Sequence, residues 1–154
     1  MCGIAGVYGL EGIADAQGLA KGLTNSIQHR GPDASNTYTD ESVVLVHTRL
    51  SILDLDERSN QPFKDPAGRY VLVFNGEIYN FKAVKKELSS YTFTTESDTE
   101  VLLAAWLKWG IDCLSRFNGM FAFTIWDKAK KELFIVRDRM GIKQVYFYLG
   151  DKNF

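Results

Sequence analysis

The residue best suited to do chemistry in this sequence is Cys2. The initiator methionine is usually removed before a small second residue, and its removal would leave Cys2 with a thiol and a free α-amine on one carbon. Because the reference pKa is about 8.5 for a thiol and about 7.7 to 8.0 for an α-amine, the amine could take up the thiol proton near neutral pH. Cys2 would then supply both nucleophile and base. If Met1 were retained, we expect the protein to be inactive. The alternative is that the Cys2 thiol has no catalytic role, and other residues must decide between these two interpretations.

Three further features match what a thiol attacking the side-chain amide of an amino acid would need. The pair Asn75-Gly76 offers a side-chain amide and a backbone N–H that could stabilise an oxyanion. Arg49 could hold an α-carboxylate, and Asp98 an α-ammonium group. Each feature has an ordinary structural alternative. Asn-Gly is a common turn, Arg49 could form a surface ion pair, and an acid in the first turn of a helix interacts favourably with the helix dipole.

Hydrophobic periodicity indicates which elements would position these residues. Helices are predicted at residues 16–27, within 77–88 and at 98–109, the last one ending at Gly110. Asn75-Gly76 would then be a corner between a strand and a helix. Strand-like stretches are predicted at residues 3–8, 42–47, 49–53, 70–75, 120–126, 132–136 and 144–149, with a hairpin turn at 127–130.

The helix after residue 96 has the clearest start signal, because Ser97-Asp98-Thr99-Glu100 has the S-x-x-E form of a capping box. The stretch 120–126 is apolar on both faces, which indicates a sheet covered by another sheet on one side and by helices on the other. The pattern is consistent with a layered α+β fold.

Length and charge exclude several classes of protein. The 154 residues are typical of one domain, and the net charge of −1 provides no basic field for nucleic acid. No apolar stretch approaches the roughly 20 residues of a membrane span, and the first residues do not resemble a signal peptide. We therefore expect a cytoplasmic protein whose partner is a small molecule or another protein.

The remaining cysteine and the two histidines suggest no second site. A lone bridge between Cys2 and Cys113 would be a poor disulfide framework, so we expect separate thiols, with Cys113 buried in a helical stretch. His29 and His47 are too few for a metal site, which usually needs three or four ligands. We expect no metal, and we expect both histidines to support packing or a loop.

Eight segments of the sequence together resemble the glutaminase domain of asparagine synthetase (glutamine-hydrolysing), in the family's order. This domain belongs to the class II glutamine amidotransferases, which are N-terminal-nucleophile hydrolases with a four-layer αββα sandwich. The resemblance therefore implies an α+β fold of that type. The segments are MCGIAG at 1–6, HRGPD at 29–33, HTRLSI at 47–52, Gln61-Pro62, NGEIYN at 75–80, SDTE at 97–100, GMFAF at 119–123 and RDRMGIK at 137–143.

The resemblance also implies roles for the residues that could attack an amide. Cys2 would be the nucleophile once Met1 is removed, with its own α-amine handling protons. Asn75 and the amide of Gly76 would form the oxyanion hole. The thiolate would attack the side-chain amide of glutamine, ammonia would leave, and hydrolysis of the thioester would give glutamate.

Substrate-binding residues follow from the same resemblance. Arg49 would hold the α-carboxylate of L-glutamine, Glu77 would line the pocket, and Asp98 would bind the α-ammonium group. Arg30 and Asp33 match the HRGPD loop near the nucleophile and are candidate supporting residues.

The chain departs from the family pattern in its C-terminal part. Gln144 replaces an expected proline and Val145 a leucine, and the sequence ends at Phe154, before strands with which relatives continue. We therefore expect residues 1–154 to form a C-terminally truncated glutaminase domain without its synthetase domain. No cofactor is expected here, since ATP and Mg would belong to the absent synthetase domain, whose phosphate-binding motifs the chain lacks.

The sequence leaves open what the released ammonia would serve. The expected partner is a C-terminal synthetase domain that makes asparagine, and a homodimer is compatible with this resemblance. One alternative is an amidotransferase that serves another acceptor, such as a sugar carboxylate. A second is a noncatalytic docking domain that keeps the fold.

Overall fold

The computed structural model describes residues 2–50 and 56–150. Within these ranges, seven strands form two antiparallel sheets, one with the order β1-β3-β2 and the other with the order β4-β5-β6-β7. The strands are β1 (Gly3–Tyr8), β2 (Ala34–Thr39), β3 (Val43–Arg49), β4 (Phe63–Lys64), β5 (Tyr70–Ile78), β6 (Gly119–Asp127) and β7 (Glu132–Arg137).

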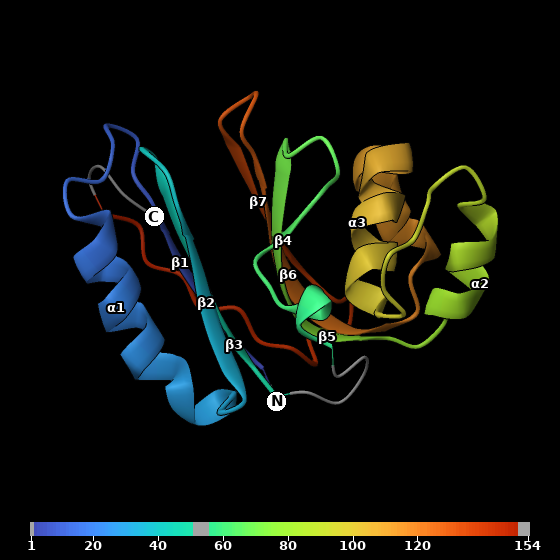
Figure 1. Cartoon of the computed structure of the whole chain (residues 1–154), viewed down its shortest axis with the longest axis horizontal. Helices are drawn as coiled ribbons and strands as arrows, with labels where there is room; N and C mark the ends of the chain where they lie inside the picture. Colours follow the sequence, from blue (N-terminus) through green and yellow to red (C-terminus); the bar gives the residue numbers. More distant parts are fainter. Residues whose placement is uncertain (1, 51–55, 151–154) are drawn as a thin grey trace.

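Helices cover the outer faces of both sheets, which gives four layers in the order α, β, β, α (Figure 1). Helix α1 lies against the first sheet, α3 lies against the second, and α2 packs beside α3. The helices are α1 (Ala16–Ile27), α2 (Phe81–Glu87) and α3 (Asp98–Trp109), with the 3-10 turns η1 (Gln28–Arg30), η2 (Glu57–Ser59) and η3 (Gly110–Arg116). The four-layer α+β architecture expected from the sequence is confirmed. No helix within the described ranges has the length and apolar character needed to cross a bilayer.

Side-chain alternation along the strands produces three separate apolar layers, because successive side chains point to opposite faces of a sheet. On β3, Val44 and Val46 pack against α1, whereas Val43 and Leu45 face the second sheet. On β6, Phe121, Phe123 and Ile125 pack toward α3, whereas Trp126 faces the first sheet. Both sheets are thus covered on both faces, as the apolar sequence at 120–126 predicted.

Most of the predicted elements are present. The predicted helices correspond to α1, α2 and α3, and the last one ends at Gly110, whose φ of 56° lies in the left-handed region that favours glycine. Strands β1, β5, β6 and β7 cover the stretches predicted at 3–8, 70–75, 120–126 and 132–136, with a turn between β6 and β7. Two further strands, β2 and β4, were not predicted. The sequence ASNTYT of β2 is polar because this strand lies at a sheet edge and is largely exposed.

The predicted corner at Asn75-Gly76 is wrong. Strand β5 runs straight through both residues to Ile78, and Gly76 faces Phe121 across the ladder with β6. An Asn-Gly pair favours a tight turn in isolation, but nine consecutive residue pairs with β6 keep this segment extended. The helix follows only at Phe81.

The strand predicted at 144–149 is also wrong. These residues are in no strand, and Tyr146, Phe147 and Tyr148 are exposed. Aromatic residues have a high strand propensity, but this propensity is realised through pairing and packing with a neighbouring strand, and the described structure contains no such pairing here. A separate strand was predicted at 49–53, but its first residue, Arg49, is the last residue of β3. Residues 51–53 lie outside the described residues.

The predicted capping box forms only in part. The Ser97 hydroxyl accepts a hydrogen bond from the Glu100 amide at 3.4 Å, as the motif requires. The Glu100 carboxylate does not return to Ser97. It accepts bonds from the backbone amides of Thr94 and Thr95 at 3.0 and 2.6 Å, because the preceding loop folds over the first turn of α3. Glu100 therefore stabilises that loop and does not complete the capping box.

Candidate active site

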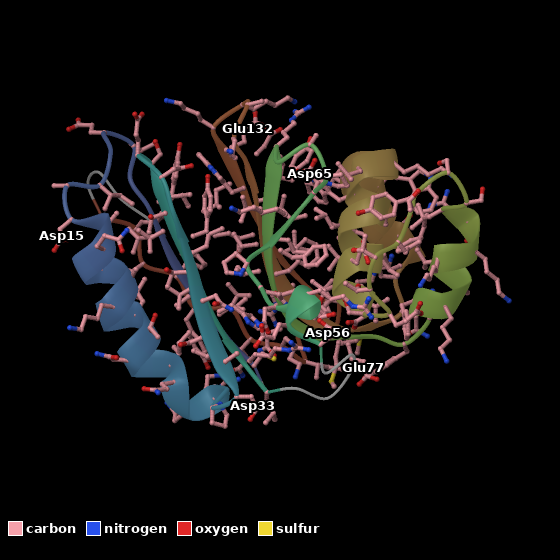
Figure 2. The ribbon with its side chains drawn as sticks, in the orientation of Figure 1. Asp15, Asp33, Asp56, Asp65, Glu77 and Glu132 are labelled. Carbon is pink, nitrogen blue, oxygen red and sulfur yellow. The ribbon has the colours of Figure 1, made fainter. Side chains whose placement is uncertain are left out.

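A cavity of about 130 Å³ opens at one end of the layer between the two sheets. Six residues singled out in the sequence for nucleophilic attack, oxyanion stabilisation or substrate binding line it: Cys2, Arg49, Asn75, Gly76, Glu77 and Asp98. Figure 2 shows Asp33, Asp56 and Glu77 at this end of the sandwich and Asp65 and Glu132 at the other.

The period of two along each strand explains why polar groups gather here. The row of β3 side chains that faces the second sheet begins with Val43 and Leu45 and continues with His47 and Arg49. The facing row on β5 begins with Val71 and Val73 and continues with Asn75. Each row is apolar in the middle of the sandwich and polar at the end where the cavity lies.

Cys2 sits at the start of the corresponding row on β1, two residues before Ile4, which packs between the sheets. Its Sγ accepts a hydrogen bond from the Leu50 amide at 3.4 Å and lies 3.6 Å from the Leu50 carbonyl oxygen, to which the thiol can donate. The Cys2 carbonyl accepts from Arg30 Nε at 3.4 Å. The pairing of β1 with β3 and these contacts fix the thiol at the cavity wall.

The Arg49 guanidinium is buried beside the nucleophile, with only 7% of the residue exposed. Its Nη1 donates to the backbone carbonyl of Asp56 at 3.0 Å and to Asn60 Oδ1 at 2.6 Å. These acceptors on both sides of η2 orient the guanidinium at the cavity wall. Its positive charge and planar set of donors make it suited to bind a carboxylate.

Gly76 allows β5 and β6 to approach closely at the cavity. A Cβ atom at this position would overlap the carbonyl oxygen of Met120 and lie 2.6 Å from Cα of Phe121. The neighbouring Asn75 faces Ala122 in the ladder and directs its amide toward the first sheet, beside Cys2 in the cavity lining. The strand therefore places a side-chain amide and a glycine N–H next to each other without a turn.

Asp98 begins α3 and lies against the end of β5. Its Oδ2 accepts a hydrogen bond from the Ile78 amide at 3.0 Å, and only 5% of the residue is exposed. Burial raises the pKa of Asp98 to about 6; the charge of Glu77 adds to this rise, and hydrogen bonds from backbone amides oppose it. A cation bound in the cavity would favour the ionised carboxylate, which makes Asp98 suited to bind an ammonium group.

The two supporting candidates do not line this cavity. Arg30 contacts the Cys2 carbonyl and lines a larger neighbouring cavity between the sheets. The Asp33 amide donates to the Arg49 carbonyl at 3.0 Å, so this residue connects the HRGPD loop to the end of β3. Both contact the backbone of site residues, and neither is among the residues that line the cavity.

The cavity also contains residues to which the sequence analysis assigned no site role, notably His47, Gln61 and Lys143. His47 is 1% exposed, and its Nε2 has no hydrogen-bond partner within the described structure. Burial lowers the pKa of His47 to about 4; a hydrogen bond to the Phe74 backbone opposes this shift, and the nearby Arg49 charge contributes to it. Its position two residues before Arg49 on one strand is the sequence signal that would have placed it in the site.

Neither cysteine forms a disulfide, and Cys113 is buried in a helical stretch, the 3-10 turn η3, as expected. Burial raises the pKa of the Cys113 thiol to about 12, so this thiol is unreactive at neutral pH. Residues 2–50 and 56–150 contain no cluster of three or more side chains able to hold a metal ion.

Comparison with known proteins identifies the family. A family model described as a glutamine amidotransferase domain matches residues 1–154. Asparagine synthetases (glutamine-hydrolyzing) 1 and 2 of Bacillus subtilis (strain 168) are 43% and 40% identical to this chain, and both alignments cover 96% of it. The same alignments cover 24% and 20% of those two proteins, so the chain spans about a quarter or less of their length.

A solved structure supports the fold. Glutamine phosphoribosylpyrophosphate amidotransferase from B. subtilis superposes with a TM-score of 0.68 at 22% identity, over 90% of this chain and 37% of that chain. The α+β sandwich fold implied by the sequence resemblance is therefore confirmed. Because the family model matches its whole length, this chain belongs to the glutamine amidotransferase domain family.

Proposed function

We propose that Cys2, with Met1 removed, hydrolyses glutamine to glutamate and ammonia. The α-amine takes the thiol proton, and the thiolate attacks the side-chain amide carbon of L-glutamine. The tetrahedral intermediate collapses with transfer of that proton to the departing ammonia, which leaves a thioester on Cys2. Water then attacks the thioester, and glutamate and the thiol are released.

The observation that carries this proposal is the convergence of six chemically matched groups on one small cavity. Asn75 and the Gly76 N–H would stabilise the oxyanion of each tetrahedral intermediate. Arg49 and Asp98 would bind the α-carboxylate and the α-ammonium, and Glu77 would line the pocket beside the ammonium group.

We further propose that the ammonia serves an ATP-dependent asparagine synthetase part of a longer polypeptide. The support is the similarity to asparagine synthetases of which this chain matches a quarter or less. ATP and Mg would be used by that part, and the glutaminase reaction would need only groups of this chain. The cytoplasmic location expected from the sequence stays a prediction.

The experiment uses the natural polypeptide containing this chain, with its N-terminus established by mass spectrometry. We expect glutamate release from glutamine by the form that starts at Cys2, and no release when Met1 is retained or Cys2→Ser is introduced. An electrophilic glutamine analogue should label Cys2. Cys113→Ala, in the core and outside the cavity lining, is the matched thiol control and should keep the activity.

Absence of both glutamate release and Cys2 labelling in the processed protein would overturn the proposal and favour a noncatalytic docking domain. If glutamate is released but aspartate with ATP gives no asparagine, the glutaminase would serve another acceptor, such as a sugar carboxylate.

A further inference from the structure

Beyond the end of β4, the edge of β5 beside the cavity presents a row of backbone N–H groups, two of which have side-chain acceptors. The Phe74 amide donates to the Gln61 side-chain oxygen at 2.6 Å, and the Ile78 amide donates to Asp98 Oδ2 at 3.0 Å. In an antiparallel ladder the N–H groups of every second residue point to the same edge. The Gly76 N–H, midway between the other two, is therefore directed to this edge, where an oxyanion would need it.

Gln61 occupies the place of a strand neighbour on this edge. Strand β4 pairs with β5 only at Leu72 and Val71 and begins at Phe63, so it does not reach Phe74. The Gln61 side chain extends this pairing by one hydrogen bond. Only 6% of the residue is exposed, and without it the Phe74 N–H would be buried without an acceptor.

The other end of the same amide reaches α3. Gln61 Nε2 donates to Thr99 Oγ1 at 3.3 Å, and Thr99 directly follows Asp98 in the first turn of the helix. One buried side chain thus bridges the strand that carries Asn75 and Gly76 and the helix that carries Asp98. The amide oxygen and nitrogen of Gln61 each make one of these contacts, so Gln61 connects the two elements that carry the proposed substrate-binding groups.

We propose that Gln61 is a positioning residue for glutamine turnover, which sets the separation between the oxyanion donors on β5 and the ammonium-binding carboxylate on α3. This inference rests on the proposed glutaminase function. Glutamine would span that separation, with its side-chain amide at Cys2 and its α-ammonium at Asp98. Loss of the bridge would then affect both ends of the substrate: kcat through the oxyanion donors and KM through Asp98.

The test measures kcat and KM for glutamine in the processed natural polypeptide and in variants of the bridge. Gln61→Met keeps the length of the side chain and removes both hydrogen bonds; we expect kcat to fall at least tenfold and KM to rise. Gln61→Glu keeps an acceptor for Phe74 and can accept from the Thr99 hydroxyl, so we expect it to restore kcat to within about threefold of the parent. Gln17→Met, the same change at an exposed site on α1, should leave both constants unchanged.

Two measurements separate positioning from folding and from general loss of the nucleophile. Alkylation of Cys2 by iodoacetamide needs neither the oxyanion donors nor Asp98, so its rate should be the same in Gln61→Met and the parent. Should Gln61→Met fail to fold, Thr99→Val removes only the helix contact. It is expected to raise KM several-fold with kcat within twofold, and Thr99→Ser, which keeps the hydroxyl, should restore KM.

A folded Gln61→Met variant with parental kcat and KM would overturn this inference while leaving the glutaminase function intact. Equal KM values for Thr99→Val and Thr99→Ser would also contradict it. If the parent itself releases no glutamate, the proposed glutaminase function fails, and this result is distinguishable from the two results that would contradict only the role of Gln61.

Discussion

His47 and Asp98 line one cavity, and burial shifts their pKa values in opposite directions. The pKa of His47 falls to about 4 and that of Asp98 rises to about 6, since in each case the charged form loses its hydration. At neutral pH the imidazole is therefore uncharged while the carboxylate is ionised. Residue type alone would give ordinary values for both groups, so the site owes these properties to its position inside the sandwich.

The first prediction concerns substrate binding. Because the proposed ammonium-binding form of Asp98 is the ionised one, we expect kcat/KM for glutamine to fall about tenfold per pH unit below about 6. Most of this change should appear in KM, since bound ammonium would stabilise the carboxylate. The measurement is initial rates of glutamate release between pH 5 and 8. An acid limb that stays at the same pH in Asp98→Asn would contradict the assignment.

The second prediction concerns stability. The folded state keeps His47 neutral while the unfolded imidazole takes up a proton, so the His47 contribution to stability is lost as pH falls from 6.5 to about 4. Asp98 acts in the opposite sense, because the folded carboxyl keeps a proton that the unfolded one releases as pH rises from 3.8 to about 6. The two contributions should largely offset each other between pH 4 and 6.

Urea unfolding at several pH values tests this. The free energy of unfolding of Asp98→Asn should rise with pH between 4.5 and 6 more steeply than that of the parent, and that of His47→Gln should fall with pH. Asp127 and Asp138, whose pKa values are lowered, contribute mainly at lower pH. Identical pH slopes in the three proteins would show that neither buried group titrates as described.

At the scale of elements, the space around a glycine decides how its replacement by alanine affects the protein. Gly76 lies where β5 and β6 leave no space for a side chain. Gly22 is exposed on α1, and apart from its chain neighbours and the backbone of its own helix, no described atom lies within 4 Å of the place that a Cβ would take there. The same substitution at these two positions should therefore have opposite effects, although both glycines lie inside regular elements.

The third prediction compares Gly76→Ala with Gly22→Ala. Gly76→Ala should destabilise the protein by roughly 1–3 kcal/mol or more, because the ladder must open, and should abolish measurable glutamine turnover. Gly22→Ala should stabilise it by about 0.5–1 kcal/mol through helix propensity, with unchanged kinetics. Thermal unfolding and glutamate release measure both effects. A stable, active Gly76→Ala protein would mean that β5 and β6 tolerate a wider spacing.

On the scale of the whole molecule, the two sheets are joined at the end of the sandwich opposite the cavity. Trp126 on β6 is 1% exposed, and its Nε1 donates to Asp40 Oδ2 at 2.7 Å, in the turn between β2 and β3. The same carboxylate accepts bonds from the amides of Ser42 and Val43 and from the Tyr38 hydroxyl. The contact thus connects the far ends of both sheets.

The fourth prediction is that Trp126→Phe lowers the free energy of unfolding by about 2 kcal/mol, because a hydrogen bond to a partly buried carboxylate is lost. KM and kcat for glutamine should stay within twofold of the parent, since the cavity lies at the other end of the strands. Trp109→Phe, on the partly exposed end of α3, is the matched control and should change stability less. A large loss of activity in Trp126→Phe would show that the two ends of the sandwich are coupled.

Local sequence determined much of this architecture. The helices, the β6–β7 hairpin and the start of α3 at Ser97 follow from periodicity and capping, which depend on neighbouring residues. The nucleophile, the oxyanion donors and the substrate-binding residues could be named because Cys2, Asn75-Gly76 and their companions occur in motifs typical of one family. Their roles in catalysis remain predictions.

Tertiary structure alone decided how these residues meet. Asn75-Gly76 lies in a straight strand because pairing with β6 outweighs a local turn preference. The segment 144–149 is no strand because the strand propensity of its residues needs a partner strand. The shifted pKa values of His47 and Asp98 and the bridge made by Gln61 depend on burial and on contacts between residues 13 to 38 positions apart in the chain. Residue types set what each group can do chemically, whereas packing of distant segments sets its distances and its exposure to water.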